Sequence, residues 1–113
     1  MDLIVDVRPE AGHTVLAATG EIDIHTAHTL QDRLADVVAS GERTLIVDLG
    51  GVEFLDSSGL SALVGGLNKV RDVGGSLSLA CPHANLLKLF AITGLDQVLV
   101  IHPTVAAAIA YAP

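Results

Sequence analysis

Aromatic residues and cysteine are scarce in this sequence. There is no tryptophan, and the aromatic residues are Phe54, Phe90 and Tyr111, although 50% of the chain is hydrophobic. The core must therefore be built from aliphatic side chains, and 113 residues suffice to bury one such core. The single cysteine, Cys81, cannot form an internal disulfide, and beside Pro82 we expect it to be a small buried residue rather than a reactive thiol.

Basic residues are also few. Six Lys and Arg residues oppose thirteen Asp and Glu residues, which gives a net charge of -7, and the six are scattered along the chain. Nucleic acids and anionic membranes are bound by clustered basic side chains. The charge balance therefore argues against nucleic acid or membrane as a partner.

Long apolar runs are missing as well. The longest uncharged stretch, Gln97 to Pro113, is too short to span a bilayer and contains His102. Asp2 stands where a signal peptide would carry basic residues. We therefore expect a cytoplasmic protein made of one domain, residues 1–113.

The apolar pattern predicts strands that alternate with helices. We expect strands over residues 3–7, 14–19, 45–49 with 52–55, 76–80 and 97–101, and helices over 27–39, 60–70, 85–92 and 104–112. Pro9 to Gly12 is interpreted as a turn, and Thr26 as the N-cap of the first helix. Gly65 and Gly66 fall inside the second helix, where small residues favour close packing on the sheet over a flat surface for a partner. The order ββαβαβαβα predicts an α/β fold with an N-terminal hairpin, a mixed β-sheet, parallel crossovers and about four helices.

The segment from Thr44 to Leu60 carries the most informative motif. Its nearly continuous apolar run is typical of a strand buried on both faces, and it leads through Asp56-Ser57-Ser58-Gly59 into a helical pattern. In α/β sheets, ligand and partner sites lie where strands end in loops. The loops at residues 20–26 and 56–59 are therefore expected on one edge.

Two interpretations of this Asp-Ser-Ser-Gly loop follow from its residues. Asp and Ser are preferred N-cap residues, so the loop can serve to begin a helix and nothing more. Alternatively, Ser57 is a regulated hydroxyl. A phosphoryl group there would add about -1.5 to -2 charge. We expect free N–H groups of the helix start to receive that group. With Asp56 and Glu53 near and no arginine cluster, the added charge would repel a partner without unfolding the chain.

Four stretches carry a resemblance to a known family: Gly20 to Ala27, Phe54 to Leu60, Gly74 to Leu77, and Leu89 to Leu95. In order and spacing they cover nearly the whole chain. The chain resembles the bacterial anti-sigma factor antagonists (anti-anti-sigma factors) of the STAS domain family. This resemblance predicts a STAS-type fold.

The resemblance implies a binding protein that is not an enzyme and needs no cofactor. Its partner would be an anti-sigma factor that is also a serine kinase with a histidine-kinase-like ATP fold, and binding would free a sigma factor. Phosphorylation of the first serine after the aspartate, here Ser57, would switch binding off, and a PP2C-type phosphatase would restore it. The partner-binding residues implied are Asp23, His25, Thr26, Asp56, Ser57, Ser58, Gly59, Leu60 and Ser61.

The chain departs from the family pattern at two positions. Ser61 stands where members often have glycine, and it adds a third hydroxyl to the implied partner face. His28 stands where many relatives have proline. Ser58, one residue further into the helix than Ser57, is interpreted as a cap or a hydrogen-bond partner that shapes the loop.

Other classes fit the residues less well. A response-regulator receiver would use Asp56 as its phospho-acceptor, but the paired acidic residues after the first strand are missing. Ser57 lacks the Gly-x-Ser-x-Gly elbow of serine hydrolases, and no glycine fingerprint for dinucleotides is present. His25 and His28 could share a face at a helix start, but two histidines without a third ligand are more typical of a surface than of a metal site. The main alternative is a STAS scaffold or signalling module that is not phosphorylated or that binds a different protein.

Overall fold

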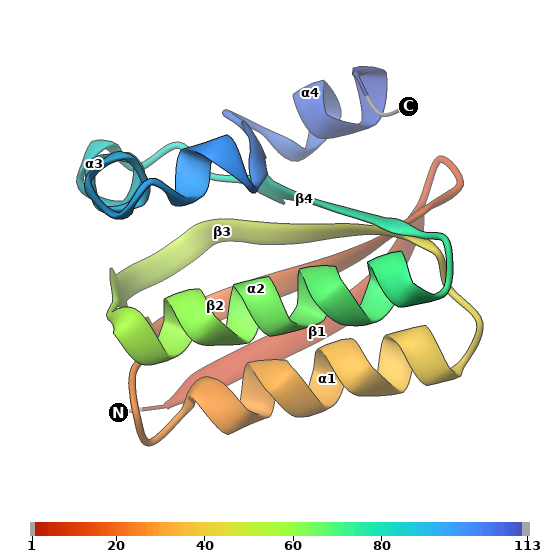
Figure 1. The fold of residues 1–113 in the computed structure, drawn as a ribbon, viewed down its shortest axis with the longest axis horizontal. Helices are drawn as coiled ribbons and strands as arrows, with labels where there is room; N and C mark the ends of the chain where they lie inside the picture. The colour runs from red at the N-terminus through yellow and green to blue at the C-terminus, as the bar shows by residue number, and fades with distance from the viewer. Residues whose placement is uncertain (1, 112–113) are drawn as a thin grey trace.

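One five-stranded sheet and four α-helices make up the structure, a computed structural model that describes residues 2–111 (Figure 1). The predicted order of elements is confirmed, with a 3-10 turn (η1) added before the last strand. The elements are β1 Leu3–Glu10, β2 His13–Ile22, α1 Ala27–Ala39, β3 Thr44–Leu55, α2 Ser57–Asp72, β4 Ser76–Ala80, α3 Ala84–Thr93, η1 Leu95–Gln97, β5 Val100–His102 and α4 Val105–Ala110.

The strands follow one another across the sheet in sequence order, from β1 to β5. β1 is antiparallel to β2, and all later pairs are parallel, so the predicted mixed sheet with an N-terminal hairpin is confirmed. Right-handed crossovers that always step in the same direction place their helices on one face. In Figure 1 α1 and α2 lie together against that face, and α3 adds Leu86 and Phe90 to the same core.

The opposite face of the sheet is covered by α4. Its Ala108 packs against Val15, Ile46 and Ala80 in a second, smaller apolar cluster. The core is aliphatic as predicted: Phe90 is fully buried, whereas Phe54 is 46% exposed. None of the described helices is both long enough and apolar enough to span a lipid bilayer.

The first turn is tighter than predicted. Pro9 and Glu10 still belong to β1, and Ala11 and Gly12 alone connect the two strands. Both turn residues have positive φ, 50° and 82°, which is typical of the two-residue hairpin turns that match strand twist. The prediction took Pro9 as a turn signal, but proline is tolerated on an edge strand. There its nitrogen can face solvent, so the sheet loses no hydrogen bond.

Besides β1, the strands β2 and β3 are longer than the sequence indicates, and β5 is shorter. β3 continues through Gly50 and Gly51, which were expected to interrupt it, and β2 continues to Ile22, so the loop after β2 is shorter than predicted. Register shifts in the β2–β3 ladder accommodate the extra residues. A Cβ at Gly51 would lie 3.0 Å from the Ala18 carbonyl oxygen, so the strands approach closely at this glycine. β5 begins only at Val100, because η1 takes up the residues before it.

The glycine pair in α2 serves helix–helix packing. A Cβ at Gly66 would lie 2.6 Å from Leu34 Cδ1 of α1, whereas a Cβ at Gly65 would meet no atom within 4 Å. The close contact therefore joins α2 to α1, and the prediction that it joins α2 to the sheet is wrong. Gly65 remains exposed on the outer surface.

Alanine at these two neighbouring positions should have different effects on stability. Gly65→Ala should raise the free energy of unfolding by about 1 kcal/mol, because alanine favours the helix and meets no neighbour. Gly66→Ala should be about 1–3 kcal/mol less stable than Gly65→Ala, because its methyl must displace the buried Leu34. Urea unfolding of both variants tests this. Equal stabilisation would show that Leu34 moves without cost.

Candidate functional site

The ends of β2 and β3 bring the two predicted loops together. Ile22 and Leu55 pair across the parallel ladder, and the Asp56 N–H donates to the Ile22 carbonyl at 3.2 Å. The expectation that both loops lie on one edge is confirmed. The order of the described strands never reverses, so this edge has no topological switch point of the kind at which open α/β sheets bind small ligands. The loops form a continuous rim instead.

The loop before α1 is closed by Asp23 and Thr26. Asp23 Oδ1 accepts the N–H of His25 at 2.8 Å and that of Thr26 at 3.1 Å. The Thr26 hydroxyl donates to the Glu21 carbonyl at 2.7 Å and accepts the Asp23 N–H at 3.0 Å. Thr26 precedes α1 as predicted, but its side chain does not cap that helix. It instead fixes the loop to the end of β2.

Asp56 caps α2. Its Oδ1 accepts the N–H of Ser58 at 2.8 Å and that of Gly59 at 3.4 Å, so two of the helix's free donors are already taken. The expectation that the N–H groups of the helix start are free for a phosphoryl group on Ser57 is therefore wrong for Ser58 and Gly59. Ser58 shapes the loop through its backbone, whereas the cap itself is the aspartate.

The serines of this region differ in exposure. Ser57 and Ser61 are exposed, one helical turn apart, and Ser58 is half-buried. No side-chain hydrogen bond among the described residues holds the Ser57 hydroxyl, which leaves it available at the surface. Gly59 is buried, and a Cβ there would collide with Leu55 and Ile22. This glycine lets α2 begin directly against the strand ends.

Burial divides the predicted partner-binding residues into two groups. His25, Ser57 and Ser61 are exposed, Asp23, Asp56 and Ser58 are intermediate, and Thr26, Gly59 and Leu60 are buried. The buried ones position the others. Sequence reasoning missed two apolar residues on this edge, Ile24 at 74% exposure and Phe54 at 46%. The available signal for Ile24 was an apolar side chain inside a predicted loop, whereas Phe54 lies in a predicted strand and gave no such signal.

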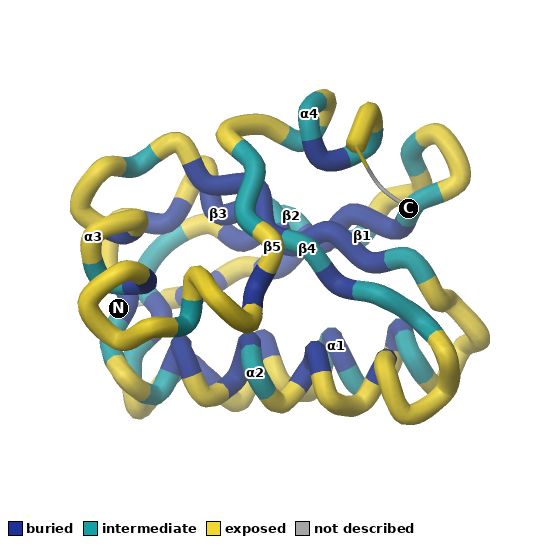
Figure 2. Tube along the Cα trace, turned by 45° about the horizontal axis from the view of Figure 1, so that its top comes forward, coloured by how far each residue is buried: buried dark blue, intermediate teal, exposed yellow. Residues whose placement is uncertain are grey.

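A shallow groove, wide open to solvent, runs from Ser57 along α2. It measures about 540 Å³, and its other wall is the junction of α3 and η1. Figure 2 shows the exposed outer surface of α2 and the segment after α3 above its first half. Sequence reasoning placed the Leu89 to Leu95 stretch in a family motif but could not bring it against α2, because that contact depends on the crossover. The lining residues are Ser57, Leu60, Ser61, Val64, Gly65, Asn68, Thr93 and Leu95.

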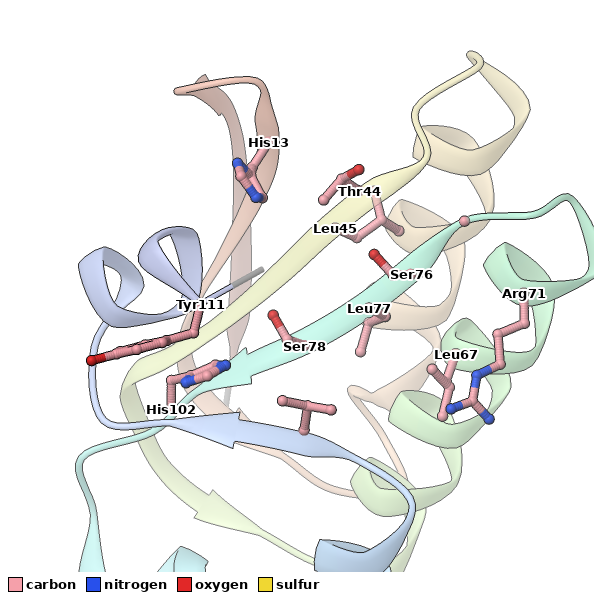
Figure 3. Close-up of a pocket in the computed structure, with 12 residues that line it drawn as sticks. His13, Thr44, Leu45, Leu67, Arg71, Ser76, Leu77, Ser78, His102 and Tyr111 are labelled. Atoms are coloured by element: carbon pink, nitrogen blue, oxygen red, sulfur yellow. The ribbon is translucent and has the colours of Figure 1, made fainter. Parts of the chain in front are cut away.

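A second hollow lies at the opposite end of the sheet. It measures about 120 Å³ and opens beside the first residues of β4, as Figure 3 shows. His102 and Tyr111 stack there with ring centroids 6.0 Å apart. The starts of β3 and β4, at Thr44 and Ser76, line this hollow, so it is remote from the strand ends that carry Asp56.

The histidines and the cysteine define no metal or thiol site. Within residues 2–111, no three or more His, Cys, Asp and Glu side chains are arranged to hold a metal ion. His25 and His28 are both exposed, in keeping with the interpretation as surface residues. Cys81 is 1% exposed, and its burial raises the pKa of the thiol. The prediction that Cys81 is a small buried residue is confirmed, and a raised pKa disfavours the thiolate, the reactive form of cysteine.

The fold and this rim define a STAS domain, and the chain belongs to that family: the STAS domain model matches residues 4–108. The chain is 35% identical to the anti-sigma-B factor antagonist of Bacillus subtilis over 99 residues, which are 88% of this chain and 90% of that one. The crystal structure of an anti-sigma factor antagonist from Mycobacterium paratuberculosis aligns with a TM-score of 0.82 and 31% identity, over 96% of this chain and 92% of that one.

The fold is also that of a protein solved in two states. Unphosphorylated SpoIIAA, an anti-sigma factor antagonist, aligns with a TM-score of 0.70 at 19% identity, over 92% of each chain. Phosphorylated SpoIIAA of Bacillus aligns with a TM-score of 0.72 at 22% identity, over 97% of this chain and 100% of that one. At these identities the likeness concerns the fold alone.

Removing the Asp56 carboxylate should weaken the start of α2. Asp56→Ala should lower the free energy of unfolding by about 1 kcal/mol, because the Ser58 and Gly59 N–H groups lose their acceptor. Asp56→Asn keeps an acceptor oxygen and should retain most of that stability. Urea unfolding compares the two, and an equal loss in both would attribute the effect to charge rather than to capping.

The Asp23 carboxyl should titrate below its ordinary pKa of 3.8. The hydrogen bond from the His25 N–H is the main cause of the lowered pKa, and the Thr26 N–H adds to it. A pKa lowered in the folded state contributes stability that is present above 3.8 and is lost as the pH falls through the folded pKa. The loop should therefore keep its conformation at neutral pH and open only in acid. NMR titration of the Asp23 carboxyl, folded and in urea, tests this, and coincident curves would contradict it.

Proposed function

We propose that this protein is an anti-sigma factor antagonist that works by partner switching. Its unphosphorylated form binds an anti-sigma factor with serine kinase activity and thereby frees a sigma factor. Phosphorylation of Ser57 by that kinase ends binding, and a PP2C-type phosphatase restores it. The chain acts as a cytoplasmic binding module of one domain, without a cofactor or a reaction of its own.

The observation that carries this proposal is the separation of cap and hydroxyl at the start of α2. The Asp56 carboxylate accepts the N–H groups of Ser58 and Gly59, whereas the neighbouring Ser57 hydroxyl is exposed and makes no side-chain hydrogen bond among the described residues. A kinase can therefore modify Ser57 without breaking a hydrogen bond that starts α2. The modification changes the surface and leaves the architecture in place.

The charge of the site explains why phosphorylation would end binding. The chain has a net charge of -7, and Asp23 and Asp56 are already on the two loops of this rim. A phosphoryl group at Ser57 adds about -1.5 to -2 more. With the Ser58 and Gly59 N–H groups already occupied, that charge stays at the surface where a partner would have to desolvate it.

The relatives support this role and the choice of partner. The B. subtilis relative, 35% identical to this chain, is named an anti-sigma-B factor antagonist, which supports an anti-sigma factor as the partner. The rival function is a STAS scaffold that is not phosphorylated. An exposed, unbonded serine in the place of the family's phospho-acceptor favours the switch over the scaffold.

The first experiment is phosphorylation with site mapping. The protein is incubated with Mg-ATP and each histidine-kinase-like serine kinase of its own cell, and intact mass is followed by peptide mapping. One phosphate on Ser57, absent from Ser57→Ala, is expected with one of the kinases. Phosphorylation by none of them would overturn the switch and leave the scaffold function.

Substitutions at Ser57 should separate folding from binding. Ser57→Ala should keep the wild-type unfolding temperature and bind the kinase as the unphosphorylated protein does. Ser57→Asp should also fold but bind at least about tenfold more weakly, because an unpaired charge at an interface costs roughly 2–5 kcal/mol. Calorimetry with the purified kinase measures both affinities. Equal affinities would rule out repulsion as the mechanism.

A further inference from the structure

We propose that the groove between α2 and the α3–η1 junction is part of the partner interface, and that it receives an apolar side chain of the anti-sigma factor. This inference rests on the proposed function. It extends the interface beyond the two loops to Thr93 and Leu95, which form one wall of the groove. These two residues lie more than thirty positions after Ser61, the last of the predicted partner-binding residues.

The lining of the groove fits an apolar anchor. Leu60, Val64 and Leu95 supply its apolar surface, and Ser57, Ser61 and Asn68 are uncharged polar groups along it. Every lining residue is uncharged, in a chain with thirteen acidic and six basic residues. Interfaces concentrate their binding energy in apolar anchors that fill desolvated pockets, and this groove can be desolvated without burying a charge.

The surroundings define the rest of the partner's surface. The strand-end rim beside the groove carries Asp23 and Glu53 together with exposed Ile24 and Phe54. Charge complementarity with an acidic rim requires basic side chains on the partner. The occupant is therefore an apolar side chain flanked by lysine or arginine, not a small molecule and not a second copy of this acidic chain.

The groove also indicates how phosphorylation of Ser57 would act on the bound partner. Ser57 is itself a lining residue, so a phosphoryl group there would lie at the mouth of an otherwise uncharged groove. An anchor side chain could then bury itself only by also desolvating the phosphoryl group. The switch would in this way act on the contact that contributes most to affinity, in addition to repelling the partner across the rim.

Gly65 allows a test that leaves the fold intact. It lines the groove, is exposed, and has open space where a Cβ would be. Gly65→Gln should fill the groove, and Gly65→Ala should improve helix propensity while leaving the groove open. Thr93→Gln places the same side chain on the opposite wall. Lys69→Gln, on α2 but outside this groove, is the matched control.

The affinity of each variant is measured by calorimetry with the kinase that phosphorylates wild-type Ser57, and unfolding temperatures are recorded in parallel. Gly65→Gln and Thr93→Gln should each bind at least about tenfold more weakly, while Gly65→Ala and Lys69→Gln stay within about twofold of wild type. Gly65→Gln should unfold at or above the wild-type temperature, which excludes misfolding as the cause.

Each other result overturns the inference in a recognisable way. If both unphosphorylated glutamine variants bound the kinase with wild-type affinity, and the kinase still phosphorylated their Ser57, the groove would not belong to the interface. The proposed function would then still stand. A change in oligomeric state caused by Gly65→Gln, seen by light scattering with unchanged kinase affinity, would assign the groove to a second copy. Failure of the wild-type chain to bind any of the kinases would overturn the proposed function, and this inference with it.

Discussion

The parallel pairing of β2 with β3 is the interaction on which the site depends. It places Ile22 beside Leu55, and the hydrogen bond from Asp56 to the Ile22 carbonyl fixes the start of α2 to the end of the neighbouring strand. The Asp23 loop begins directly after the same Ile22. Two segments thirty residues apart thus become one rigid rim, and each helix projects back from it along the sheet.

Adjacent side chains at this rim have separate tasks. The side-chain oxygens of Asp56 and Thr26 form hydrogen bonds with backbone groups and hold the loops in place. Ser57 and His25 are exposed at the surface. Because structural and exposed groups alternate along the chain, a surface residue can be modified while its neighbour maintains the loop. The same separation explains why the proposed phospho-acceptor needs no special environment: its local geometry is set by other residues.

The sequence was sufficient to predict the order of elements, because apolar periodicity and glycine or proline signals mark each strand and helix of this fold. It also placed the two loops on one edge, since parallel strands end together. It failed where tertiary context overrides a local signal. Gly50 and Gly51 continue β3 because the β2 ladder absorbs them in register shifts, and Pro9 stays in β1 because that strand is an edge.

The site was predicted less completely than the fold. The role of Asp56 as cap depends on which of three neighbouring polar residues, Asp56, Ser57 or Ser58, directly precedes the first residue with helical dihedrals, and capping propensities do not distinguish Asp from Ser. The groove was beyond reach, because Thr93 and Leu95 meet α2 only through the packing of a crossover on the sheet. Ile24 lies in a predicted loop and Phe54 in a predicted strand, and the exposure of both became evident only from the packing of the fold.

The sequential strand order has a consequence for how this chain folds. Each strand after the hairpin pairs with the strand that precedes it in the chain, so loop closures stay short and every new crossover adds to a sheet that already exists. A ribosome that releases the chain from its N-terminus would deliver the strands in the order in which they assemble. Of the described elements, α4 follows all others in the chain, and until it has emerged Val15 and Ile46 lack its apolar cover. Until α4 docks, the nascent chain therefore exposes this small apolar cluster on the face of the sheet opposite α1 and α2.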